Sequence, residues 1–350
     1  MDISNQVAEQ LLIDLVSIPS PSHHEKQAVE HLVNWMRAYG YDQAFVDDAG
    51  NAVGIIGSGT RDVMLLGHID TFGGFPDVRV DARTLYGRGS VDAKSPLCAF
   101  AIAACRARLT DDVRVIVVGA VEEESSSSKG ARHIRSIYQP QMCIIGEPSQ
   151  WDRITLGYKG RLLIRWRYHG ALSHSAGSAL SIPEIAVDNW LDLVDYTKKF
   201  NGNKEMLFSK LDIALQEINS GQDGAYGWAD MLIGFRLPPN FDVDALQIDL
   251  RHQMTADIEF YGYEPAYAAP RTTNLSRYFR RAIRKNGGSP RFVYKTGTSD
   301  MNIVAPHWSG CEFLAYGAGD SALDHTPDEH VDLDEWLRSV DILTDVLSSV

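Results

Sequence analysis

Histidine and carboxylate side chains recur in this chain directly after short apolar runs that are typical of buried strands. The first motif is His68-Ile69-Asp70, and the last contains His325 within 324–329. Between them, further carboxylates occur singly or in a cluster, namely Asp92, Glu122–Glu124 and Glu147. Imidazole and carboxylate ligands suit Zn²⁺ or a similar first-row metal ion. We therefore treat these side chains as candidates for a metal centre.

Each motif taken alone also has an ordinary structural explanation. His68 could be satisfied beside a capping Asp70, and Asp92 could cap a helix over 94–108. The acidic triplet could be a solvated loop, although adjacent carboxylates at the end of a buried strand repel one another unless cations neutralise them. Taken together, the motifs supply enough ligands for two ions ~3.5–4 Å apart, with one bridging carboxylate and one free base.

The elements that must position these side chains alternate between helix and strand. Apolar spacing predicts helices over about 6–17, 25–39, 94–108 and 129–137, and strands over 43–46, 52–56, 63–66, 113–121 and 142–145. The run 113–121 is apolar almost throughout, which is typical of a strand buried on both faces. The pattern predicts an α/β fold in which a mostly parallel sheet is flanked by helices.

A different pattern occupies residues 156–266. Residues 162–168 alternate apolar and charged side chains, which predicts a half-exposed strand at a sheet edge that could pair with its copy. Helices are expected over 182–200 and 243–253, strands over 231–236 and 257–261, and a loop over 216–227. We therefore predict a smaller inserted α+β domain at 156–266 and a larger discontinuous domain at 1–155 and 267–350.

The composition restricts the expected partners and location. The 350 residues include 33 Lys plus Arg and 46 Asp plus Glu, a net charge of −13, which argues against binding to nucleic acid or an anionic membrane. No apolar run reaches the ~18 residues that span a bilayer, and the first residues do not resemble a signal peptide, so a cytoplasmic location is expected. The cysteines form no C-x-x-C pair and are predicted to be buried thiols in a reducing compartment: Cys98, Cys105, Cys143 and Cys311.

The order of the histidine and carboxylate motifs resembles the M20 family of dinuclear zinc amidohydrolases. This family includes acetylornithine deacetylase, succinyl-diaminopimelate desuccinylase and carboxypeptidase G. The resemblance covers nearly the whole chain, including the insert, which in this family is a lid and dimerisation domain. It implies two Zn²⁺ ions per subunit, for which Co²⁺ can substitute, and a homodimer.

The resemblance also implies a role for each site residue. Asp92 would bridge the two ions, Glu124 and His325 would hold one ion, and His68 and Glu147 would hold the other. Glu123 would be the general base, and Asp70 would stand behind His68. His174, within the insert, would stabilise the oxyanion in the partner subunit's site, although a surface-loop histidine is the ordinary alternative.

Three further segments, 121–130, 157–160 and 295–302, resemble one subgroup of the family. That subgroup is implied to cut the amide between the C-terminal glutamate side chain of an acidic amino-group carrier protein and lysine or ornithine, in lysine or arginine biosynthesis. It is also described as acting on acetyl-lysine or acetyl-ornithine. Arg271 and Thr298 are candidates for binding the substrate's α-carboxylate or amine, because arginine matches a carboxylate as a fork. A basic stripe within 277–285 could meet the acidic carrier, or could be a solvated helix face.

Alternatives to this function stay open at this stage. The metal motif does not separate the carrier hydrolase from acetylornithine deacetylase, succinyl-diaminopimelate desuccinylase or an M20 dipeptidase, since substrate choice lies in the pocket. A metal-binding scaffold without activity would carry the same ligands. The intact base Glu123 beside the ligand Glu124 argues against such a scaffold.

Overall fold

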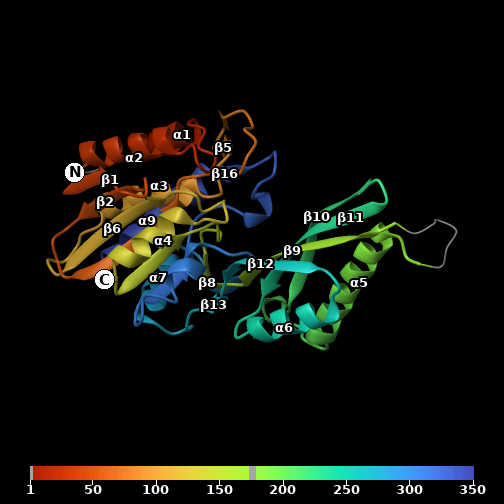
Figure 1. Ribbon diagram of the computed structural model, residues 1–350. Helices are drawn as coiled ribbons and strands as arrows, with labels where there is room; N and C mark the ends of the chain where they lie inside the picture. Colours follow the sequence, from red (N-terminus) through yellow and green to blue (C-terminus); the bar gives the residue numbers. More distant parts are fainter. Residues whose placement is uncertain (1–2, 173–178) are drawn as a thin grey trace. The chain divides into compact units, whose positions relative to one another are not determined.

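The computed structural model describes residues 3–172 and 179–350, and the chain divides into two units (Figure 1). The first unit comprises Met1–Gly157, Ala269–Tyr294 and Ser299–Val350. The second comprises Tyr158–Ala268 and Lys295–Thr298. The short segment Lys295–Thr298 therefore groups with the second unit, although it follows the predicted insert in the sequence.

The first unit is built on a mixed sheet whose central strands are parallel. β6, β3, β7 and β15 run parallel, whereas β2 pairs with β1 and with β6 in antiparallel fashion. This arrangement confirms the predicted α/β class with a mostly parallel sheet. The strands follow one another across the sheet in the order β1 (Gln43–Val46), β2 (Ala52–Ile56), β6 (Val113–Ala120), β3 (Arg61–His68), β7 (Met142–Gly146), β15 (Glu312–Ala315) and β8 (Arg153–Tyr158), and β14 (Arg291–Lys295) pairs with β8.

The central strands are continuously apolar because helices pack against the sheet. Residues 63–66 of β3 and 115–118 of β6 have no exposed surface. α3 packs against β3, β6 and α9, whereas α2 packs against β1 and β2. The helices of this unit are α1 (Asn5–Val16), α2 (Lys26–Ala38), α3 (Lys94–Arg106), α4 (Lys129–Ile137), α7 (Asn274–Lys285), α8 (Asp300–Val304) and α9 (Leu333–Leu347).

A small antiparallel sheet joins two distant segments of the first unit. β5 (Thr84–Tyr86) lies between β4 (Arg79–Asp81) and β16 (His330–Asp332), with His330 opposite Tyr86. A short 3-10 turn, Ser321–Leu323, precedes this second segment. The small sheet therefore fixes the chain just before Asp92 beside the chain just after His325.

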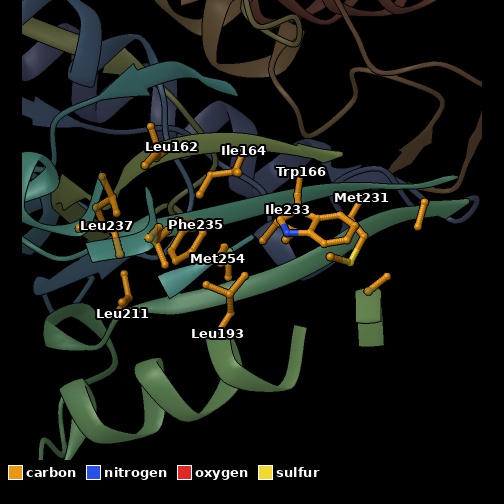
Figure 2. Close-up of a cluster of buried hydrophobic side chains, with 14 of the residues drawn as sticks. Leu162, Ile164, Trp166, Leu193, Leu211, Met231, Ile233, Phe235, Leu237 and Met254 are labelled. Atoms are coloured by element: carbon orange, nitrogen blue, oxygen red, sulfur yellow. The ribbon is translucent and has the colours of Figure 1, made fainter. Parts of the chain in front are cut away.

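The second unit is a four-stranded antiparallel sheet with helices on one face. Its strands run in the order β10 (Asp212–Asp223), β11 (Tyr226–Leu237), β9 (Gly160–Ala171) and β12 (Asp257–Glu264). Its helices are α5 (Ile182–Asn201) and α6 (Val243–Gln253), with a 3-10 turn at Leu207–Ser209. The longer segment of the unit ends with the short strand β13 (Tyr267–Ala268), which is not part of this four-stranded sheet. Alternate side chains of β9 and β11 form the core with residues of α5 and α6, and Figure 2 shows Trp166 and Leu193 within this cluster.

Two expectations for the insert are wrong in detail. β9 is an interior strand, paired with β11 on one side and β12 on the other, and is not a sheet edge. Its alternating pattern reports one covered face, and says nothing about lateral neighbours. The expected loop 216–227 instead forms most of β10 and the start of β11. β10 escaped detection because it is an edge strand with mostly exposed side chains and therefore lacks apolar alternation.

The structure also tests the predicted burial of the cysteines and the expected lack of a membrane-spanning segment. Cys98 and Cys143 are buried as predicted, whereas Cys105 and Cys311 are only half-buried. Burial raises the pKa of Cys105 to about 12. Within the described ranges, the helices are too short or too polar to cross a bilayer.

Candidate metal centre

The predicted ligands converge because they follow neighbouring parallel strands. His68 is the last residue of β3, the acidic triplet follows β6, and Glu147 follows β7. β3 lies between β6 and β7 in the sheet, so the three strand ends share one edge. Asp92 comes to this edge from the loop before α3, and His325 from the segment before β16.

Asp92 stands at the centre of the cluster because each of its carboxylate oxygens faces an imidazole. Oδ1 lies 3.2 Å from Nε2 of His68, and Oδ2 lies 3.2 Å from Nε2 of His325. The same nitrogen of His325 lies 3.0 Å from Oε1 of Glu124. Ligand atoms of His68, Asp92 and Glu124 all lie within 4.8 Å of one another. This is the arrangement that a bridging carboxylate between two ions requires.

Asp70 orients both His68 and the acidic triplet. The Nδ1 atom of His68 donates to the backbone carbonyl of Asp70 at 2.9 Å, which directs Nε2 towards Asp92, so that loss of the Nε2 proton would free this nitrogen to bind a metal ion. The carboxylate of Asp70 accepts from the backbone N–H groups of Glu123 and Glu124, both at 3.0 Å, and from Ser22 Oγ at 2.7 Å. Burial raises the pKa of Asp70, but its hydrogen bond and charge interaction with His68 outweigh this and hold the pKa below its usual value.

Negative charge accumulates at the carboxyl edge of the sheet. Burial raises the pKa of Glu123 well above its usual value; the neighbouring Glu147 and Asp300 carboxylates raise it further, against the lowering influence of His68. Burial also raises the pKa of Glu147, and the charge on Asp92 adds to the effect. Several carboxylates that are hard to ionise together form a site that a divalent cation stabilises.

The histidines hold protons that metal ions would replace. Hydrogen bonds to Asp92 and Glu124 raise the pKa of His325 to about 10. Burial lowers the pKa of His68, but its hydrogen bonds to Asp70 and Asp92 outweigh burial and raise it overall. A cation gains ligands here only as these protons leave, which makes binding pH-dependent. The donor set therefore fits a metal ion in chemistry and in charge.

Arg271 and Thr298 each have contacts of their own, whereas His174 lies outside the described residues. Arg271 is exposed, and its guanidinium lies 5.4 Å from the centre of the Phe292 ring. Thr298 belongs to the second unit, where its hydroxyl accepts a hydrogen bond from Arg236 at 3.0 Å.

Sequence reasoning missed three residues that contact the ligands or their loops. The Phe72 ring stacks on His325 with centroids 4.3 Å apart. Arg88 and Glu329 form a buried ion pair that reaches the loop of Asp92. Arg88 lies within the motif that carries Asp92, and Glu329 within the motif that carries His325. The sequence therefore shows both residues, but only the fold shows that the two motifs are in contact.

Comparison with known proteins identifies relatives along the whole chain. The model of "Peptidase family M20/M25/M40" matches residues 64–349. A LysW-lysine hydrolase of Deinococcus radiodurans is 43% identical over 98% of this chain and 97% of its own length. A putative LysW-lysine/LysW-ornithine hydrolase of Thermococcus kodakarensis is 37% identical over 99% of this chain and 93% of its own. A solved Bacillus subtilis protein, described as a dinuclear metal binding peptidase, shares the fold at a TM-score of 0.69 and 12% identity, over 99% of this chain and 98% of its own.

Proposed function

This chain belongs to peptidase family M20/M25/M40, and from that premise we propose that it is a metal-dependent amide hydrolase that releases lysine or ornithine from LysW. The identity to the Deinococcus radiodurans hydrolase over nearly both full lengths is the observation that carries the substrate class. The contacts of Asp92 with both imidazoles support the reaction class. The bond cut is the amide between the carrier's glutamate side chain and the released amino acid.

We assign the metal ligands within this proposal as two overlapping sets. Asp92 would bridge two Zn²⁺ ions, with Co²⁺ as a substitute; Glu124 and His325 would complete one set, and His68 and Glu147 the other. When bound, the ions polarise the amide carbonyl and strengthen water as a nucleophile at neutral pH.

Glu123 moves the proton in this mechanism. Its backbone is held by Asp70. Loss of water around its half-buried side chain, together with the neighbouring carboxylates, raises its pKa, which favours a role as general base. It accepts a proton from the attacking water and donates it to the leaving amine as the amide bond breaks. Asp70 serves this step by positioning both His68 and the backbone of Glu123.

Three residues complete the proposal in binding roles. His174, contributed by a second subunit of a homodimer, would donate to the oxyanion. Arg271 and Thr298 would bind the carboxylate or amine of the lysine or ornithine portion. Support for these roles comes from residue chemistry and the family resemblance, and each role is testable by substitution.

The carrier itself would meet a basic surface, since it is acidic. α7 offers one: Arg277, Arg281 and Arg284 are exposed and recur at spacings that place them on one helix face. We define these three residues as the α7 arginine stripe. It would attract the carrier, whereas a small N-acyl amino acid would not depend on it.

A direct comparison of substrates tests the proposed function. The purified enzyme is supplied with carrier-linked lysine, carrier-linked ornithine, acetyl-ornithine and succinyl-diaminopimelate, and amine release is measured for each with and without a metal chelator. We expect the highest kcat/KM for a carrier-linked substrate, and loss of activity on chelation. Preference for acetyl-ornithine or succinyl-diaminopimelate would move the enzyme to the corresponding alternative, and metal binding without hydrolysis of any of them would favour a scaffold.

A further inference from the structure

We infer that Glu329 is a positioning residue of the metal centre: it fixes the loop that carries Asp92 and, through Arg88, links that loop to the one that carries His325. The inference rests on the proposed function, because it assigns a purpose to the same metal site. Glu329 is not a proposed ligand, base or substrate contact, and its role is to hold the backbone from which ligands project.

The Glu329 carboxylate gathers the backbone of the Asp92 loop. Its Oε1 atom accepts three hydrogen bonds, from the N–H groups of Gly89 at 3.0 Å, Val91 at 2.9 Å and Asp92 at 3.0 Å. Glu329 is 1% exposed, so water does not compete for these donors. Charged acceptors hold N–H donors more strongly than neutral ones. The backbone of Asp92 is therefore tied directly to Glu329.

Arg88 extends this connection to the His325 segment. Its Nη1 atom donates to Oε2 of Glu329 at 2.6 Å, and Nη2 lies 3.5 Å from the backbone carbonyl of His325. Its Nε atom donates to the carbonyl of Gly74 at 3.1 Å. Arg88 is 7% exposed, so its ion pair with Glu329 is buried. Together its contacts connect three loops around the site.

A requirement for precise ligand placement explains why a charged pair is buried here. Burying an ion pair costs desolvation energy that apolar side chains of similar size would not incur. Asp92 must present two oxygens to two imidazoles, both at 3.2 Å, and a loop free to move would not maintain both contacts. The loop also contains Gly89 at φ +86°, where an added Cβ would lie 2.9 Å from Lys94 Cδ. The Glu329 carboxylate therefore holds a loop whose backbone at Gly89 adopts a positive φ that residues other than glycine rarely adopt.

The test separates positioning of the metal ligands from general support of the fold. Glu329→Gln is compared with the double variant Glu329→Gln/Arg88→Met, which removes both buried charges. Asp62→Asn is the matched control, because Asp62 forms a two-contact pair with Arg114, at 2.7 Å for each contact, that does not involve the site. Co²⁺ affinity is measured by titration of the metal-free full-length protein, followed by visible absorption, and thermal unfolding is recorded for each protein without metal.

We expect Glu329→Gln to weaken Co²⁺ binding by about 10–100-fold, the usual effect of losing a partner behind a metal ligand. The double variant should recover thermal stability, since no charge is left buried alone, while its Co²⁺ affinity stays low. Asp62→Asn should lose stability and keep its affinity. If Glu329→Gln does not fold, the double variant alone decides.

Two results would overturn the inference. One is wild-type Co²⁺ affinity in folded Glu329→Gln, and the other is recovery of affinity together with stability in the double variant. Absence of Co²⁺ binding by the wild-type protein would instead contradict the proposed function, and the inference would fail with it. Measuring the wild-type protein first therefore distinguishes the two failures.

Discussion

The proposed metal centre assigns separate tasks to neighbouring residues, and Glu123 and Glu124 show this most clearly. They are adjacent in the chain, and Asp70 holds the backbone N–H of both. Glu124 contacts His325, whereas the pKa of Glu123 responds to burial and to several neighbouring charges. The assignment of Glu123 as base and Glu124 as ligand comes from the family resemblance and stays a prediction. The contacts with Asp92 required the fold, since the residues are far apart in sequence.

Glu123→Gln should abolish turnover without removing the metal ions. The amide keeps the size of the carboxylate but cannot accept a proton from water, and base catalysis contributes ~10²–10⁴-fold. Metal content by elemental analysis and kcat on the carrier-linked substrate check both halves of this prediction. Near-wild-type kcat in a metal-replete variant would show that another group is the base.

The stability of the metal-free protein should fall as the pH rises from about 6.5 towards 10. Hydrogen bonds to Asp92 and Glu124 raise the pKa of His325 from 6.5 to about 10 in the folded state. A raised histidine pKa contributes stability that is complete below the unfolded value and is lost as the pH rises through the folded value. Thermal unfolding across this pH range measures the effect. His325→Gln should flatten the dependence, and an equally steep fall in that variant would assign it to another group.

At the scale of elements, the sequence predicted best where apolar side chains mark a buried face. α4 spans 129–137 as predicted, and the apolar run 113–121 becomes β6, Val113–Ala120. In the second unit α6 also spans 243–253 as predicted, but β10, exposed on an edge, was expected to be a loop, and β9, covered on only one face, was expected to be an edge strand. A strand with one covered face shows alternating apolar and polar side chains. Its backbone hydrogen bonds to neighbouring strands do not affect that pattern. Strand order there could not be predicted for that reason.

The α7 arginine stripe gives a prediction about an element rather than a single group. Arg281→Glu should lower kcat/KM for the carrier-linked substrate by about tenfold, because charge reversal slows the encounter of oppositely charged partners. Hydrolysis of a small N-acyl substrate should not change. Lys26→Glu on α2 is the matched control, since it reverses one exposed positive charge in the same unit. Equal losses in both variants, or on both substrates, would show that α7 does not receive the carrier.

For the whole molecule, the interior position of β9 argues against the expected pairing of that strand with its copy. β11 pairs with β9 along its whole length, and β12 pairs with it between Arg161 and Arg167. A homodimer is therefore not expected to form along this part of β9, and the proposed role of His174 across subunits does not depend on which surface is used. The prediction of a homodimer therefore does not depend on pairing between two copies of β9.

Mixed subunits test whether His174 acts in a partner's site. Glu123→Gln and His174→Ala should each be nearly inactive alone. A heterodimer of the two contains one site with an intact base and an intact histidine, so its activity should recover towards about half that of wild type. Verified heterodimers without recovery, or a monomeric active enzyme, would show that His174 does not work across subunits.

The long separation in sequence between partners at the metal centre has a consequence for synthesis of the chain. Glu124 and His325 are 201 residues apart, and Asp92 and Glu329 are 237 apart. The whole second unit, including Lys295–Thr298, is translated within both intervals. A ribosome that stalls anywhere before His325 releases a polypeptide without one ligand and without Glu329. In the proposed centre, metal retention would thus report that translation had passed His325, and the ions would distinguish such chains from shorter fragments.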